Sequence, residues 1–166
     1  MKNQLKAGIL WLLLIVFDQI VKLWVLASLK GKEAIVLIKD VLELRYVENR
    51  GAAFGIFQNK QWFFVIVSII VLIALILIAR NIPDSERYVF LKISMYFIAA
   101  GAVGNMIDRI FRRYVVDFIY FKLIDFPVFN VADIYVTCAA ILLILLLIFY
   151  YKDEELEEIL SFRKHS

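Results

Sequence analysis

WFFVIVSIIVLIALILIA, the stretch from Trp62 to Ala79, decides the fold class of this chain because it contains no charged residue. The hydrocarbon core of a bilayer is about 30 Å thick, so a helix needs about 20 consecutive apolar residues to cross it. A stretch of this length and composition therefore predicts a membrane-spanning helix over residues 62–79.

Three further stretches have a similar composition, so the chain is expected to cross the membrane four times. The predicted spans are residues 8–29, 62–79, 88–107 and 131–151. Of the 166 residues 63% are hydrophobic and the mean hydropathy is +0.82, which is more apolar surface than a soluble domain of this size can bury. We expect an all-α membrane protein in which residues 1–166 form one integral-membrane domain, with long connectors at residues 30–61 and 108–130.

The first span carries Asp18, Gln19 and Lys22. These polar residues interrupt the region that would be purely apolar in a cleaved signal peptide, so we expect the span to stay in the mature protein. Asp18 and Lys22 are four residues apart, which places them on one face of a helix where they can neutralise each other. They are either a structural pair that supports the helix bundle or directly functional, because ionisable residues inside a membrane are functional candidates.

Four spans place both termini on one side of the membrane and both long connectors on the other. Lys2 and Lys6 precede the first span, and the tight loop at residues 80–87 begins and ends with arginine. Since short flanking segments normally decide insertion, we expect cytoplasmic termini. A plain count of basic residues favours the opposite orientation, because the connectors carry more of them. Those basic residues either attract anionic lipid head groups or form a solvated loop surface.

The first connector contains a segment that is typical of a β-strand. Leu42, Leu44 and Tyr46 alternate with Glu43, Arg45 and Val47, which is the period of two expected of a half-buried strand. Residues 115–121 are also rich in β-branched and aromatic side chains. We expect the first long connector to form a small extracytoplasmic β-sheet that lies on the bilayer.

The sequence argues against catalysis by a histidine-activated nucleophile and against a zinc site. Its single histidine, His165, lies in the charged tail, so Ser-His and Cys-His nucleophile systems lack a base. With one cysteine, Cys138, and no His-Glu-x-x-His motif, neither a zinc site nor an intramolecular disulfide is expected. Cys138 is predicted to be a small buried packing residue. No metal or other cofactor is expected, and carboxylates remain as the acid-base groups.

Two aspartates stand at the ends of one connector. Asp117 lies between Val116 and Phe118, an apolar setting in which a solvated loop has no need of a lone charge. Asp133 follows Asn130 at the third position of a predicted helix start, so helix capping alone would explain it, and Asp133→Asn is then expected to cost little stability. If the two carboxyls lie close together, they share one proton. The ionised member can then activate water while the protonated member polarises a scissile carbonyl, as in aspartyl proteases.

Two other groups of polar and small residues lie beside the predicted spans. Ala100 and Gly104 give the third span a small-residue face that lets another helix approach closely. Asn105, Asp108 and Arg109 follow, and the last two are expected to emerge at the surface. They either complete a helix end, or they bind a peptide backbone or orient the acids. The stretch Asn49-Arg50-Gly51-Ala52-Ala53-Phe54-Gly55 is either an ordinary turn or a segment whose backbone approaches an extended ligand.

These motifs, in this order, resemble lipoprotein signal peptidase (signal peptidase II), the bacterial aspartyl peptidase of the inner membrane. The resemblance covers nearly the whole chain. It rests on DQIVK at 18–22, NRGAAF at 49–54, GNMIDR at 104–109, VDF at 116–118 and FNVAD at 129–133.

The resemblance implies a role for each of the polar residues. Asp117 and Asp133 would be the catalytic dyad. Substrate-binding residues would be Asn49, Asn105, Asp108, Arg109 and Asn130. Structural support would come from Asp18, Lys22, Gly51 and Gly104.

The resemblance also implies a substrate and a location. The substrate would be a prolipoprotein whose future N-terminal cysteine carries diacylglycerol, cut immediately before that cysteine. The enzyme would be a multi-pass protein of the bacterial inner membrane with cytoplasmic termini and an active site at the outer-leaflet face. It would be sensitive to globomycin and would bind membrane lipids but no nucleic acid.

Other functions agree less well with the sequence. A proton-coupled transporter would use Asp18, Lys22 and Asp133 as a relay, but the acidic groups cluster on one side and no internal repeat is evident. A non-enzymatic scaffold would not explain why the charged Asp117 lies in an apolar stretch. A rhomboid-type serine protease lacks a usable histidine, and a presenilin-like protease would need Gly-x-Gly-Asp, which is absent.

Overall fold

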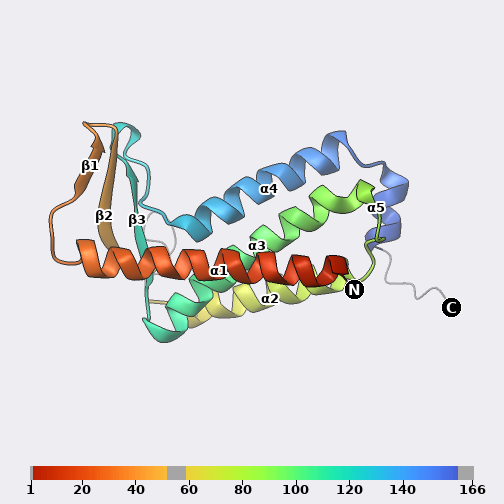
Figure 1. Ribbon diagram of the computed structural model, residues 1–166, viewed down its shortest axis with the longest axis horizontal. Coiled ribbons are helices and arrows are strands. Elements are labelled where there is room, and N and C mark those ends of the chain that lie inside the picture. The colour runs from red at the N-terminus through yellow and green to blue at the C-terminus, as the bar shows by residue number, and fades with distance from the viewer. Residues whose placement is uncertain (1, 52–58, 161–166) are drawn as a thin grey trace.

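The protein is described by a computed structural model that covers residues 2–51 and 59–160. Within those residues, four helices are long and apolar enough to cross a membrane, as predicted (Figure 1). They are α1 (Lys2–Leu29), α2 (Gln61–Ala79), α3 (Val89–Phe111) and α4 (Val131–Phe149). α3 continues one turn beyond the predicted end at residue 107, so Asp108 and Arg109 lie within the helix rather than after it.

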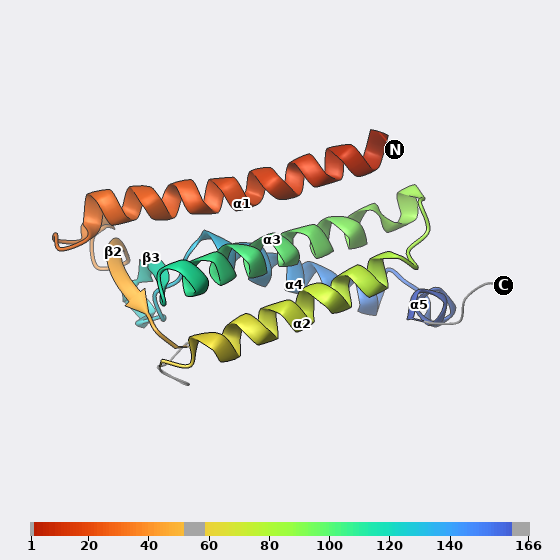
Figure 2. The same cartoon turned by 90° about the horizontal axis from the view of Figure 1, so that it is seen from below.

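α3 is the central helix of the bundle and packs against α1, α2 and α4. Figure 2 shows it between α1 and α2. The predicted small-residue face makes this close packing possible. A Cβ atom added at Gly101 would lie 2.5 Å from the Ala132 carbonyl oxygen of α4, and one at Gly104 would lie 2.5 Å from Asp18 Oδ2 of α1. A side chain at Gly101 would push the backbone of α4 away, and one at Gly104 would displace the buried Asp18 carboxylate.

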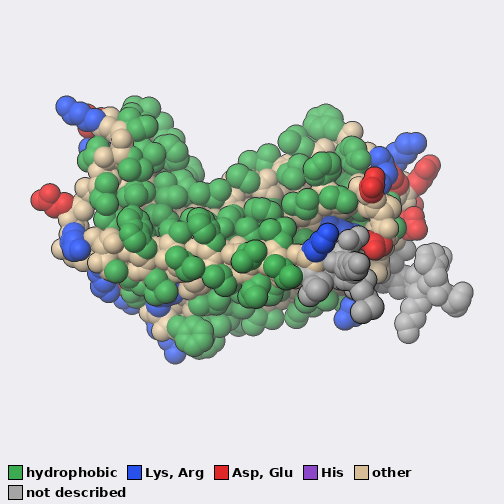
Figure 3. Space-filling model, in the orientation of Figure 1, with side chains coloured by type: hydrophobic (Ala, Val, Ile, Leu, Met, Phe, Trp, Pro, Cys, Tyr) green, Lys and Arg blue, Asp and Glu red, His purple; other side chains and the backbone are tan. Residues whose placement is uncertain are grey.

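The outer surface of the bundle is apolar along the spans (Figure 3). Leu13, Ile70 and Ile148 expose 58%, 59% and 64% of their surface, respectively. Side chains of this kind are stable when exposed only if lipid surrounds them. The protein is therefore a multi-pass membrane protein.

A three-stranded antiparallel sheet of described residues lies at one end of the bundle, in the order β1 (Ile35–Ile38), β2 (Leu42–Asn49) and β3 (Val115–Phe121). The first connector supplies β1 and β2, as the alternation predicted, but the third strand comes from the second connector. The reason is packing: Val116 and Phe118 of β3 form a buried cluster with Val25 and Leu29 of α1. This cluster fixes the sheet to the bundle.

The opposite end of the bundle is closed by α5 (Asp153–Leu160). Ile159 of α5 is buried, and Arg87 pairs with Glu155 at 2.5 Å. Residues Asp153–Leu160 of the charged tail are therefore helical, and one side of this helix is anchored to the bundle. Two short 3-10 helices, Glu86–Tyr88 and Lys122–Ile124, complete the elements of the described residues.

Candidate active site

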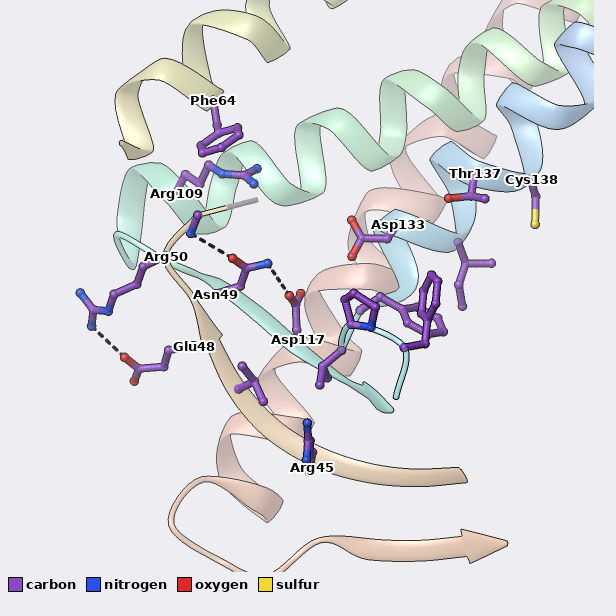
Figure 4. A pocket seen from close by; sticks show the side chains of 17 residues that line it. Arg45, Glu48, Asn49, Arg50, Phe64, Arg109, Asp117, Asp133, Thr137 and Cys138 are labelled. Atoms are coloured by element: carbon purple, nitrogen blue, oxygen red, sulfur yellow. Dashed lines mark hydrogen bonds and ion pairs between the residues drawn. The ribbon is translucent and has the colours of Figure 1, made fainter. Parts of the chain in front are cut away.

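Asp117 and Asp133 lie where the sheet meets the bundle. Asp117 is in the middle of β3, and successive side chains of a strand point to opposite faces. Since Val116 and Phe118 pack in the core beside α1, Asp117 points to the other face of the sheet. Asp133 is in the first turn of α4. Both side chains line the same pocket (Figure 4).

Asp133 belongs to the helix start predicted from the sequence. The Asn130 side-chain oxygen accepts a hydrogen bond from the Asp133 backbone N–H at 3.1 Å. In return, Asp133 Oδ2 accepts one from the Asn130 backbone N–H at 3.0 Å. This reciprocal pair is a capping box, and it holds the Asp133 carboxylate at the helix N-terminus, where negative charge is favoured.

Two asparagine side chains connect the two acids. Asn130 Nδ2 donates to Asp117 Oδ1 at 2.6 Å and to Asn105 Oδ1 at 3.2 Å. Asn105 Nδ2 in turn donates to Asp133 Oδ1 at 2.8 Å. The orientation of the Asn130 amide is fixed, because its oxygen is already used by the helix cap. The acids are thus held by one continuous set of hydrogen bonds.

Asn49, the last residue of β2, holds the second oxygen of Asp117. Its Nδ2 donates to Asp117 Oδ2 at 2.8 Å, while its oxygen accepts from the Gly51 backbone N–H at 3.0 Å. Gly51 therefore takes part in the turn that orients Asn49. Ala52, Ala53 and Phe54 of the same motif lie outside the described residues.

The environment of Asp117 favours its protonated form. Burial raises the pKa of this carboxyl to about 7, and the negative charge of Asp133 acts in the same direction. Hydrogen bonds from Asn130 and Asn49 oppose this rise, because they stabilise the carboxylate. Asp117 therefore keeps its proton to a higher pH than an ordinary aspartate does.

A buried ionic cluster lies behind the acids. Lys22 Nζ lies 3.0 Å from Asp18 Oδ2, 3.1 Å from Asp108 Oδ2 and 2.9 Å from Asn105 Oδ1. Asp18 also accepts from the Ala132 N–H at 3.0 Å. Asp18 and Lys22 thus share one face and pair, as predicted. Through Asn105, the ammonium group is also linked to Asp133.

Asp108 is fully buried, which contradicts the expectation that it emerges at the surface. It is held inside by Lys22, by an ion pair with Arg112 and by the Val116 backbone N–H at 3.0 Å. Two cations therefore balance a carboxylate that would be costly to bury alone. Spacing along α3 could not reveal this, because Lys22 comes from another helix.

The pocket has a volume of about 660 Å³. Of the predicted binding residues, Asn49 and Arg109 line it, and Arg109 lies over the Phe64 ring at 4.7 Å. Asn105, Asp108 and Asn130 instead lie in the hydrogen-bonded network behind the acids. The rest of the lining is largely apolar and includes residues 126–129 and Ile134.

The pocket lining includes residues that no sequence motif indicates. Thr137 is four residues after Asp133, so helical periodicity could have identified it. Cys138 is exposed and lines the pocket, so the prediction of a buried packing residue was wrong. Arg45 had been assigned only to the strand pattern. Among residues 2–51 and 59–160, no group of three histidine, cysteine or acidic side chains is placed to hold a metal ion.

The chain is similar to known proteins in sequence and in fold. A family model described as signal peptidase (SPase) II matches residues 10–149. A lipoprotein signal peptidase of Clostridium tetani is 45% identical over 130 residues, which is 76% of this chain and 82% of that protein. One from Streptococcus thermophilus is 44% identical over 131 residues, covering 78% of this chain and 84% of that protein.

Two solved structures, both described as bacterial membrane enzymes, are similar in fold. One has a TM-score of 0.74 at 35% identity and covers 86% of this chain and 87% of that structure. The other has a TM-score of 0.75 at 34% identity and covers 88% and 94%, respectively. The similarity therefore includes the spanning helices and the segment that carries both acids.

Proposed function

The chain belongs to the signal peptidase II family, and from that premise we propose that it removes signal peptides from prolipoproteins as an aspartyl endopeptidase. The observation that supports this most is the pair Asp117 and Asp133, held in one pocket by Asn130 and Asn105. A pair of carboxyls fixed in this way, one of which keeps its proton near neutral pH, suits water activation.

The two acids have different roles in the proposed reaction. We assign the role of the base to Asp133, because its carboxylate lies at the N-terminus of α4, where negative charge is favoured. It takes a proton from water as the water oxygen attacks the scissile carbonyl carbon. Asp117 donates its proton to the carbonyl oxygen. When the tetrahedral intermediate collapses, one of its hydroxyl groups returns a proton to Asp117 and the carbonyl re-forms. The C–N bond breaks, and the nitrogen leaves as an amine with the proton that Asp133 took from water.

The surroundings of the acids suit a lipid-modified peptide. Phe126, Phe129 and Ile134 give the pocket an apolar side, which we assign to the approach of the diacylglyceryl group. Arg109 and Asn49 offer donors to the peptide backbone. The cut falls immediately before the lipidated cysteine, and a globomycin-type inhibitor would compete for the same pocket.

The position of the acids also suits a membrane surface. They lie at the sheet end of the spans, and we assign this end to the outer face of the bacterial inner membrane. Both termini then lie in the cytoplasm, in agreement with Lys2 and Lys6 before the first span.

Mass spectrometry of the products tests this function. Purified protein in lipid or detergent is given a diacylglyceryl-modified prolipoprotein and, as control, the same prolipoprotein without lipid. We expect a released signal peptide that ends immediately before the cysteine, only from the lipidated substrate, and loss of release with globomycin. Equal cleavage of both substrates, or cleavage at another bond, would refute the proposed specificity.

A further inference from the structure

Arg45 is a pocket-lining cation to which the proposed reaction gives no role. It lies on β2, on the same strand face as Val47 and Asn49, which also line the pocket. The pairing of β2 with β3 is irregular between Leu44 and Val47. Irregularities of this kind re-aim a side chain and often lie next to active sites. In Figure 4, Arg45 lies beyond Asp117, on the side away from Asp133.

The Arg45 guanidinium is held in place, but its buried Nε lacks an acceptor among the described residues. Its Cζ lies 3.5 Å from the centre of the Tyr120 ring, which fixes the guanidinium plane. Its Nε is buried without a hydrogen-bond partner. Among the described residues no carboxylate pairs with it, since Glu43 is held by Lys122 at 2.9 Å and Glu48 by Arg50 at 2.8 Å.

A buried donor without an acceptor is destabilising, and an arginine offers five donors in a rigid plane. Such a group beside a pocket is explained if the ligand supplies the acceptors. The side of the pocket that Arg45 occupies restricts which part of the ligand this is. The signal peptide is the part of the substrate before the cut, and it runs alongside the membrane-spanning helices. The part of the substrate after the cut therefore extends from the acids toward the sheet. That part contains the two lipid esters and the peptide bonds that follow the cysteine.

We propose that Arg45 is a specificity residue that donates hydrogen bonds to uncharged carbonyl oxygens of the substrate on the mature side of the cut. This inference rests on the proposed function. The carbonyl oxygens have two possible sources, the ester groups of the lipid and the peptide backbone. Arg45 contacts neither the water nor the scissile bond, so its effect is on substrate selection rather than on the chemical step.

Three substrates separate the two sources. The first is a diacylglyceryl prolipoprotein and the second carries a dialkyl ether lipid without ester carbonyls. The third has the diacyl lipid on a terminal cysteamine in place of the cysteine, so that no backbone carbonyl follows the cut. Wild type and Arg45→Gln are compared by kcat/KM on each. The control is Arg113→Gln, because Arg113 is exposed, lies over the Trp62 ring at 5.1 Å and is outside the pocket lining.

Arg45→Gln should lower kcat/KM for the first substrate about tenfold, which corresponds to one hydrogen bond from a charged donor. If this loss disappears with the ether lipid, the acceptors are esters, and if it disappears with the truncated peptide, they are backbone carbonyls. Comparing substrates on one enzyme cancels any difference in the folded fraction. An equal loss on all three substrates, or no loss, overturns the assignment of Arg45. Failure of wild type on all three instead contradicts the proposed function.

Discussion

Removing the Lys22 charge from the buried ionic cluster should destabilise the fold strongly. The loss should affect Asp18 more than Asp108. Lys22→Met keeps an apolar stem of four heavy atoms, but Asp18 and Asp108 lose an ammonium group that lies 3.0 and 3.1 Å from them. Asp108 keeps its ion pair with Arg112, whereas Lys22 is the cation that pairs with Asp18. Removing one partner of a buried pair typically costs about 3–5 kcal/mol, because the other charge stays buried. We expect Lys22→Met to lower the free energy of unfolding by about this amount.

A double variant tests the direction of the stability change. Lys22→Met combined with Asp18→Asn removes both charges of the pair, so the double variant should be more stable than Lys22→Met alone, despite the second substitution. The matched control is Lys92→Met, because Lys92 pairs with Asp84, whose side chain is 81% exposed. That substitution should cost less than about 1 kcal/mol.

Reversible unfolding in mixed micelles, followed by tryptophan fluorescence, measures all of these free energies. If Lys22→Met lowers the free energy of unfolding by less than about 1 kcal/mol, the fold does not require the Lys22 charge. A double variant less stable than Lys22→Met would show that the two charges do not compensate each other.

Two further predictions concern the acids and the helix packing. Asn49 donates a hydrogen bond to Asp117 and thereby lowers its pKa. Asn49→Ala should therefore move the alkaline limb of the pH profile of kcat/KM from near pH 7 to higher pH. If the limb does not move, Asp117 does not control it. Gly104→Ala would place a Cβ 2.5 Å from Asp18 Oδ2 and should cost about 1–3 kcal/mol in thermal or chemical unfolding. Gly8→Ala, whose Cβ would meet nothing within 4 Å, is its control, and equal effects of the two would contradict the packing argument.

The membrane spans and the helix start at Asn130 could be predicted because their causes are local. Apolar length decides whether a segment spans a bilayer, and a cap residue acts within one turn of its helix. The third strand could not be predicted in the same way. Residues 115–121 have strand-like composition, but their pairing with β2 depends on a long-range contact with α1 that no local pattern records.

The polar residues show the same division between local and long-range causes. The Asp18–Lys22 pair follows from helix geometry, but the burial of Asp108 depends on helices that meet in space. The structure also changes the expectation that Asp133→Asn costs little. Both oxygens of Asp133 accept hydrogen bonds, so an amide nitrogen at one of them would face a donor.

Single-turnover cleavage by amide variants tests the catalytic dyad most directly. Asp117→Asn and Asp133→Asn are compared with wild type and with Asp84→Asn, an exposed acid that the proposed reaction does not use. Each protein is checked for its folded state before the lipidated prolipoprotein is added. We predict signal-peptide release by wild type and Asp84→Asn and none by either dyad variant. Near-normal release by a folded Asp117→Asn or Asp133→Asn would contradict the dyad.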